Sequence, residues 1–274
     1  MKIFYNSRKD VKIIQVIIGN SEENMVIRSI SSIDELLNFV NELSKVHGQK
    51  LWYRGEENSE LSLIPSIQRT QRRIEVERFI TNDFYIRARQ IMNNPPEKHN
   101  YADWVAIMQH YGLPTRMLDF SMSPLIASFF ACETYMTTQD QDACVWVLAP
   151  IRLNEQQGFG QCIYPNDADT TQEMLLPAFK HNHHNHELDD KILACSSTNN
   201  IMRMYAQQAC FTVHNSLKRL EDICDDETLY KMIIPKDKKK YFIDSLRVMG
   251  ITEGSIYPDL DHISADLKVA YDIV

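Results

Sequence analysis

The sequence predicts an α+β protein with a mixed, mostly antiparallel sheet and flanking helices. Segments with the apolar spacing of helices and short β-branched segments follow one another without regular strand–helix–strand alternation, which disfavours a parallel α/β fold. Glycine is scarce, with eight residues in 274, and neither a Gly-x-Gly-x-x-Gly nor a Walker pattern occurs. A Rossmann or P-loop protein is therefore disfavoured.

The composition is that of an ordinary globular protein, with 44% hydrophobic and 24% charged residues. The net charge of −8 disfavours a general nucleic-acid binder, because such proteins concentrate Lys and Arg against phosphates. The six cysteines are dispersed without a Cys-x-x-Cys pair, which argues against a zinc ribbon and predicts reduced thiols in the cytoplasm. The apolar run at 13–18 is too short to span a membrane, so we expect a strand there and no membrane partner.

The N-terminal part, residues 1–48, is expected to form strands and a helix that pack on a main domain at 49–274. Two strands are predicted within 11–30, joined by a turn at 19–21. Ser32 and Glu35 form the pattern of a capping box, which begins a helix. The residues expected on its buried face are Leu36, Leu37, Val40 and Leu43. Residues 50–54 read as a strand that ends at Gly55.

The sequence pattern in the middle of the chain predicts three helices and two strands. The first helix covers 72–93, with its charged face exposed. Its apolar residues are Ile74, Phe79, Ile80, Phe84, Ile86 and Ile91. A second helix covers 101–111 and ends at Gly112. A strand at 115–120 leads to Ser123 and Pro124, a typical N-cap and first helical residue. The following run, 125–135, is apolar nearly all round, so its helix is expected to be central and buried. A buried strand follows at 143–149.

The C-terminal part begins with residues 152–200, which we interpret as mainly long loops with short elements. Strands are predicted at 209–213 and 230–234, a helix from Pro235 to Met249, and a last helix from about Asp261. The run at 181–186 contains four histidines, but their spacing is not that of a zinc site. We therefore interpret it as a solvated loop and expect no metal.

Arg54 is the first candidate for a functional residue. Its planar guanidinium suits a phosphate or carboxylate ligand because it donates bidentate hydrogen bonds. The alternative is a buried ion pair with Glu56, Glu57 or Asp119.

A second candidate segment, residues 110–123, carries more polar side chains than a strand entering a core requires. They are His110, Tyr111, Thr115, Arg116, Asp119, Ser121 and Ser123. One interpretation is a pocket in which Arg54, His110 and Arg116 face an anionic ligand. The other is a satisfied polar network in which Arg116 pairs with Asp119 and Ser123 caps the next helix. Gln207 and Gln208, before the strand at 209–213, could orient a ligand or cap the sheet edge.

These residues resemble the signatures of the FRG-domain family, which is named for a Phe/Tyr-Arg-Gly motif. Tyr53-Arg54-Gly55 matches that motif, and the segments 110–131, 207–213 and 233–260 are similar to further family signatures. The resemblance extends over residues 50–265 and implies a domain found widely in bacteria and phages.

The order of the motifs also resembles that of ADP-ribosyltransferases of the Arg-Ser-Glu type. In this resemblance Arg54 is the arginine that holds NAD, and Ser121-Met122-Ser123 is the second motif. The third motif should supply Glu, where this sequence has Gln207-Gln208. An amide can hydrogen-bond a ribose hydroxyl but cannot supply negative charge.

The resemblance implies two sets of site residues. The catalytic set is Arg54, Asp119, Ser121 and Gln208. The ligand-binding set is Tyr53, His110, Tyr111, Thr115, Arg116, Ser123 and Gln207.

The implied function is an ADP-ribosyltransferase-like or NAD glycohydrolase effector, in a bacterial toxin or phage-defence context, with NAD as its substrate. A protein partner such as an antitoxin is then expected. The alternative is a non-catalytic nucleotide- or protein-binding sensor module, which the missing Glu favours. A nuclease is disfavoured because the chain is acidic and lacks a clear paired-carboxylate metal motif.

Overall fold

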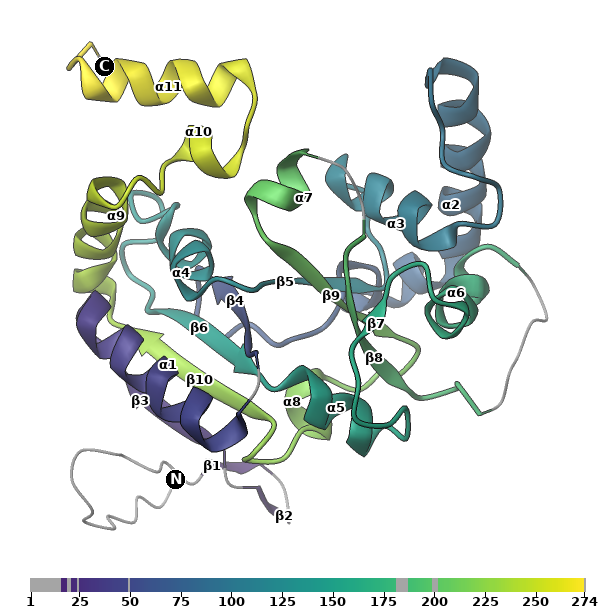
Figure 1. Cartoon of the computed structure of the whole chain (residues 1–274), viewed down its shortest axis with the longest axis horizontal. Coiled ribbons are helices and arrows are strands. Elements are labelled where there is room, and N and C mark those ends of the chain that lie inside the picture. Colours follow the sequence, from purple (N-terminus) through teal and green to yellow (C-terminus); the bar gives the residue numbers. More distant parts are fainter. Residues whose placement is uncertain are drawn as a thin grey trace.

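The computed structural model describes residues 16–18, 21–23, 25–48, 50–180, 187–198 and 202–273. An eight-stranded sheet with the order β3-β10-β6-β4-β5-β9-β8-β7 forms its centre, and β1 and β2 pair separately (Figure 1). The strands are β1 Val16–Ile18, β2 Ser21–Glu23, β3 Val26–Ser29, β4 Trp52–Glu56, β5 Met117–Ser121, β6 Ala143–Leu148, β7 Tyr164–Pro165, β8 Ile192–Ser196, β9 Ala209–His214 and β10 Leu229–Ile234. Only the β3–β10 and β7–β8 pairs of the large sheet are parallel. This confirms the predicted α+β class and the mixed, mostly antiparallel sheet.

Helices flank both halves of this sheet. The α-helices are α1 Ile33–His47, α2 Gln71–Ile91, α3 Tyr101–His110, α4 Pro124–Cys132, α5 Pro150–Gln156, α6 Asp169–Leu175, α7 Met202–Ala206, α8 Leu220–Ile223, α9 Lys239–Val248, α10 Glu253–Ile256 and α11 Leu260–Ala270. Short 3-10 turns lie at Ser66–Arg69, Leu176–Ala178 and Lys236–Lys238. None of the helices in these ranges has the length and apolar character needed to cross a membrane.

Two groups of helices cover the same face of the sheet. Apolar side chains of β4, β6 and β10 pack against α1, α4 and α9, whereas those of β5, β8 and β9 pack against α3, α6 and α7. Tyr53 belongs to the first cluster and is paired with Ser121, so the two side chains lie on one face. Met117 of the second cluster shares that face with Ser121, because it is four residues away on the same strand. The two helix groups therefore stand side by side over the sheet (Figure 1).

The sheet is divided where β4 meets β5. These strands are joined by one residue pair, Tyr53 with Ser121, whereas β4 pairs with β6 from Trp52 to Glu56 and β5 pairs with β9 along its whole length. Beyond Tyr53 the two strands separate, and the sheet forms a fork that opens beneath the gap between the helix groups.

Gly55 allows α4 to lie directly on β4. The predicted strand end at this glycine is wrong, because β4 continues to Glu56. A Cβ atom at Gly55 would lie 1.9 Å from the carbonyl oxygen of Ala127 and 2.6 Å from the amide nitrogen of Ala131. Glycine is therefore required here by the close approach of a helix backbone, and not by the end of the strand.

Helix α1 begins as predicted but buries a slightly different face. The Ser32 hydroxyl accepts from the Glu35 amide at 3.2 Å, while the Glu35 carboxylate accepts from the Ser31 amide at 2.6 Å. The buried residues are Ile33, Leu36, Phe39 and Leu43. Leu37, predicted to be buried, is 38% exposed, whereas Phe39 is buried and packs edge-on against Tyr230.

The predicted orientation of α2 is wrong. Its buried residues are Glu77, Thr81 and Ala88, whereas Phe79, Ile86 and Ile91 are exposed. The apolar spacing was therefore a poor guide to the buried face, which an ion pair of Glu77 with Arg116 occupies.

Residues 152–200 contain more regular structure than predicted. Strand β8 lies inside the sheet between β7 and β9, and its residues from Ile192 to Cys195 are fully buried. A short apolar run of this kind has no alternation to distinguish it from other buried segments, which explains why it was missed. The histidine run at 181–186 lies outside the described residues.

Candidate functional site

A polar cavity of about 310 Å³ lies in the fork between β4 and β5. We call it the fork cavity. Its walls come from β4, α3, β5, α4, α7 and β9. They are formed by Tyr53, Arg54, Gly55, Glu56, Glu57, Ala106, Gln109, His110, Asp119, Phe120, Ser121, Phe130, Glu133, Arg203, Met204, Gln207, Ala209 and Phe211. The cavity thus unites several of the predicted site residues from separate segments.

Arg54 bridges the two arms of the fork. Its Nε donates to Glu56 Oε1 at 2.7 Å, and one terminal nitrogen donates to the backbone oxygen of Asp119 at 2.8 Å. The expected ion pair with Glu56 is confirmed, and Arg54 also lines the cavity, whereas its binding of an anionic ligand stays a prediction. Its first role is to hold β4 and β5 together where their backbone pairing has ended.

Asp119 presents its carboxyl group to the cavity. The side chain is exposed where it lines the cavity, although the protein packs closely enough around it to desolvate the carboxyl group. Burial raises the pKa of Asp119, while the charges of Arg54 and Arg203 and a hydrogen bond with Gln109 act in the opposite direction. A carboxyl group with a raised pKa in a cavity is a candidate for chemistry.

Glu133 is a cavity residue that no sequence pattern indicated. It follows α4 directly, and its Oε2 accepts a hydrogen bond from the Tyr257 hydroxyl at 3.0 Å. Burial raises the pKa of Glu133, and the Tyr257 hydrogen bond and the Arg203 charge oppose that change. The residue stands at the end of an apolar run, where nothing local shows that its side chain reaches the cavity.

Arg203 is the second missed residue. It lies on α7, four residues before Gln207, and its guanidinium carbon is 4.6 Å from the centre of the Tyr257 ring. The spacing of four residues was the available signal, because it places both side chains on one side of a helical turn. Burial lowers the pKa of His110, and the charge of Arg203 lowers it further, so the His110 ring is favoured in its neutral form.

Ser121 and Ser123 support the backbone at the base of the cavity. The Ser121 hydroxyl donates to the Gln207 carbonyl at 2.8 Å and accepts from the Ser123 amide at 3.0 Å. The Ser123 hydroxyl accepts from the Ile126 amide, which confirms its predicted role as the N-cap of α4. Ser121 therefore joins β5 to the start of β9 and to the turn before α4.

Replacing Ser121 by alanine is expected to lower the free energy of unfolding by about 1–3 kcal/mol, because two partly buried backbone groups lose their partner. Chemical denaturation measures this loss, and Ser123→Ala, which removes only a helix cap, should lose about 1 kcal/mol. Unchanged stability of Ser121→Ala together with lost ligand binding would instead assign the hydroxyl to the ligand.

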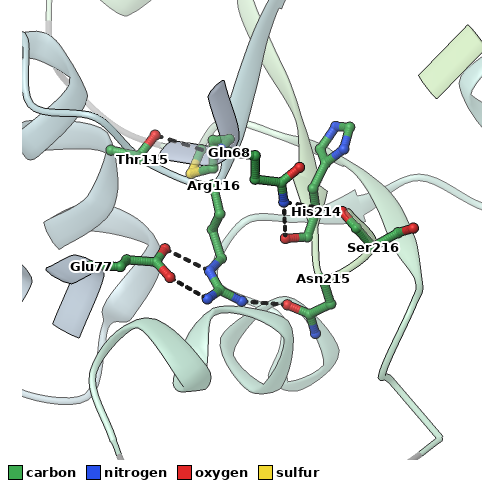
Figure 2. A network of polar contacts seen from close by, with 8 residues as sticks. Gln68, Glu77, Thr115, Arg116, His214, Asn215 and Ser216 are labelled. Carbon is green, nitrogen blue, oxygen red and sulfur yellow. Dashed lines mark hydrogen bonds and ion pairs between the residues drawn. The ribbon is translucent and has the colours of Figure 1, made fainter. Parts of the chain in front are cut away.

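Arg116 does not face the cavity. Its Nε and one terminal nitrogen donate to the two carboxylate oxygens of Glu77, and its other terminal nitrogen donates to Asn215 Oδ1 at 2.6 Å (Figure 2). The expected pairing of Arg116 with Asp119 is wrong, and Arg116 does not join Arg54 and His110 in the lining of the cavity. The local reason is that Arg116 and Asp119 are an odd number of residues apart on an extended segment, so they point to opposite faces of the sheet.

A neighbouring part of this network is also structural. Gln68 donates from Nε2 to the backbone oxygen of Ser216 at 3.0 Å (Figure 2). His214 is buried, and its burial, with the charges of Arg54 and Arg116, lowers its pKa to about 3. Its imidazole is therefore neutral, and Nε2 lies 2.8 Å from the Thr212 hydroxyl.

Three further predicted site residues lie away from the fork cavity. Thr115 is buried and its hydroxyl donates to Gln109 Oε1. Tyr111 is 71% exposed, beside the cavity residue His110. Gln208, with a left-handed φ of 48°, lines a separate groove with Tyr53. Gln207 and Gln208 directly precede β9 and line different hollows. Gln207 lines the fork cavity, and Gln208 lines the separate groove.

The charges and rings of the fork cavity favour a ligand with a positively charged part. Carboxyl groups outnumber guanidinium groups four to two among its lining residues. Aromatic rings also line it, from Tyr53, Phe120, Phe130 and Phe211. Cations are attracted both to carboxylates and to the faces of aromatic rings. Among the described residues, no group of three or more His, Cys, Asp or Glu side chains is arranged to hold a metal ion.

The fold and the site together define an α+β domain whose sheet divides around a polar cavity. Residues 49–140 match the FRG domain, so this part of the chain is identified as an FRG domain. The matched segment contains β4, α3, β5 and α4, which supply most of the cavity walls. No curated protein and no solved structure matches the chain.

Proposed function

We propose that the fork cavity binds the nicotinamide-ribose end of NAD and that the protein cleaves the bond between these two groups. The observation that carries the proposal is the meeting of Arg54, Asp119, Ser121 and Gln207 around one cavity. The motif order of the sequence predicted this meeting for an ADP-ribosyltransferase-like site. The cavity volume of about 310 Å³ is at the lower end of small-molecule sites, which suits one end of a dinucleotide.

The excess of carboxyl groups agrees with this chemistry. The nicotinamide ring of NAD⁺ is a cationic pyridinium, and bond cleavage moves positive charge to the ribose. The bond from ribose C1′ to the ring nitrogen breaks, its electron pair stays on nicotinamide, and water adds to C1′ with loss of a proton. A carboxylate near C1′ stabilises the oxocarbenium-like transition state.

We assign this role to Asp119. Asp119 lines the cavity together with Arg54, so its carboxyl group can supply the negative charge that Gln207 lacks. In its ionised form it would lie near the developing cation. Transfer to another acceptor requires the same charge stabilisation, with the acceptor nucleophile in place of water.

The Asp119→Asn variant is expected to release nicotinamide from NAD at least about a hundredfold more slowly than the unmodified chain. Chromatographic measurement of nicotinamide and ADP-ribose tests this, with Asp167→Asn as a control because Asp167 is exposed and lies outside the cavity. Equal rates for Asp119→Asn and the unmodified chain would remove Asp119 from the reaction. No nicotinamide release by the unmodified chain, with or without a macromolecular acceptor, would contradict the enzymatic proposal.

A second candidate function is a non-catalytic sensor that binds a nucleotide in the same cavity. The internal hydrogen bonds of Arg54 and Ser121 favour it, because both side chains already have partners. Calorimetry would then detect NAD or ADP-ribose binding without turnover. A toxin or phage-defence role, with an antitoxin as protein partner, belongs to the enzymatic proposal, since NAD consumption would stop growth of the cell.

A further inference from the structure

The C-terminal turn at Ile256 and Tyr257 contacts four residues of the fork cavity. Gln207 donates from Nε2 to the Ile256 carbonyl at 3.3 Å, and Phe130 meets the Tyr257 ring edge-on with centroids 6.1 Å apart. The other two contacts are those of Tyr257 with Glu133 and Arg203. A segment far beyond the matched residues 49–140 therefore supports the cavity from outside.

Tyr257 holds Arg203 by its ring. The guanidinium carbon lies 4.6 Å from the ring centre, and the same ring stacks on His262 with centroids 4.7 Å apart and an interplanar angle of 29°. A cation over the face of an aromatic ring is attracted by the ring itself, so this contact occupies none of the guanidinium N–H donors. Tyr257 itself is held by its hydroxyl, which donates to Glu133.

Arg203 differs from Arg54 and Arg116, the two arginines that the sequence singles out. Arg54 donates to Glu56 and to the Asp119 backbone, and Arg116 uses three nitrogens on Glu77 and Asn215. Among the described residues, by contrast, the Arg203 guanidinium contacts the Tyr257 ring without an ion pair or a hydrogen bond, and its charge acts on Asp119 and Glu133 from a longer distance. It is half-buried and lines the cavity.

We propose that Arg203 binds a phosphate group of the ligand and that Tyr257 positions it for that contact. This inference rests on the proposed function, because it takes the ligand of the cavity to be a nucleotide. A cavity of this volume accommodates one end of NAD, so the diphosphate lies at its boundary. A half-buried guanidinium with free edge donors matches a phosphate there by bidentate hydrogen bonds.

Three of the four carboxyl groups of the cavity have partners of their own. Glu56 is paired with Arg54, and the Glu57 carboxylate accepts from the Thr134 hydroxyl at 2.6 Å. These contacts partly satisfy two of the four carboxylates, which weakens their repulsion of a phosphate in the cavity. Glu133 is held by Tyr257 in the same way.

The test is calorimetric titration of the full chain with NAD, ADP-ribose, inorganic diphosphate and nicotinamide riboside, which has no phosphate. Arg203→Gln is expected to weaken NAD and ADP-ribose binding at least about tenfold, and nicotinamide riboside binding less than about twofold. Arg203→Lys keeps the charge without the planar fork. Its affinity for NAD and ADP-ribose should therefore lie between that of the unmodified chain and that of Arg203→Gln. Arg247→Gln, on the exposed end of α9, is the matched control and should bind every probe as the unmodified chain does.

Tyr257 provides an independent check of the positioning role. Tyr257→Phe keeps the ring beneath Arg203 and should retain most phosphate-dependent affinity, whereas Tyr257→Ala should lose it to the same degree as Arg203→Gln. Equal affinity of Tyr257→Ala and the unmodified chain for ADP-ribose would overturn the positioning role. Circular dichroism confirms that each variant is folded.

The remaining outcomes separate this inference from the proposed function. Binding of diphosphate or ADP-ribose that depends on Arg203, without binding of nicotinamide riboside or cleavage of NAD, supports the inference and contradicts the function. Cleavage of NAD that is unchanged in Arg203→Gln, with unchanged affinity, supports the function and overturns the inference. If the unmodified chain binds none of the four probes, both are overturned.

Discussion

Replacing Gly55 by alanine is expected to destabilise the protein by about 3 kcal/mol or more, the upper end of what overpacking costs. The added Cβ would lie 1.9 Å from the Ala127 carbonyl oxygen and 2.6 Å from the Ala131 amide nitrogen. Both are backbone atoms of a buried helix, so no side chain can rotate to make room. Either α4 or β4 has to move, and both carry walls of the fork cavity. Urea denaturation measures the loss.

Gly112→Ala is the control for this prediction. Gly112 has a φ of +79°, and no atom lies within 4 Å of the place that its Cβ would take. Alanine there therefore meets only the strain of left-handed backbone, about 1–2 kcal/mol. The destabilisation of Gly55→Ala should be clearly larger. A Gly55→Ala protein as stable as Gly112→Ala would contradict the close approach of α4 to β4.

Replacing Arg116 by alanine is expected to lower the free energy of unfolding by about 3–5 kcal/mol. The Arg116 and Glu77 side chains are only 12% and 8% exposed, and the pair joins α2 to the segment that begins β5. Removing the guanidinium leaves the Glu77 carboxylate buried without a counter-charge. Thermal and chemical unfolding measure the effect.

The exposed pair of Arg219 and Asp222 is the matched control, with both side chains 37% exposed. Asp222→Asn should change stability by no more than about 1 kcal/mol, because water screens such a pair. Arg116→Ala protein that remains folded at low temperature should bind cavity ligands as the unmodified chain does. A folded Arg116→Ala variant with normal stability and lost ligand affinity would return Arg116 to the binding site.

Much of the fold followed from local patterns. Ser32 with Glu35, Ser123 with Pro124, and Gly112 marked helix ends correctly, because caps depend on neighbouring backbone groups. The strands at 143–149, 209–213 and 230–234 were predicted within a residue or two. The buried face of α2 was not predicted correctly. Its buried Glu77 pairs with Arg116, which lies 39 residues further along the chain.

The candidate site, like the fold, was predicted from the sequence only in part. The segments with Arg54, Asp119 and Ser121 were placed together correctly, because polar residues crowded beside buried strands indicate a cavity. Glu133 and Arg203 were missed, since each lies in a stretch whose local pattern is that of an ordinary helix or loop. Their role depends on Tyr257, which is more than fifty residues away from Arg203 in sequence.

The sequence by itself determined the α+β class, the cap positions and the Tyr-Arg-Gly and Asp-Phe-Ser segments of the FRG domain. Only the tertiary structure decided that β4 and β5 are joined by the single pair of Tyr53 and Ser121 and diverge from there, and which arginines face the resulting cavity. The physical reason is that caps and strand periodicity depend on residues a few positions apart. The partner of a guanidinium is instead set by which distant chain segments meet, as Glu77 meets Arg116 and Tyr257 meets Arg203.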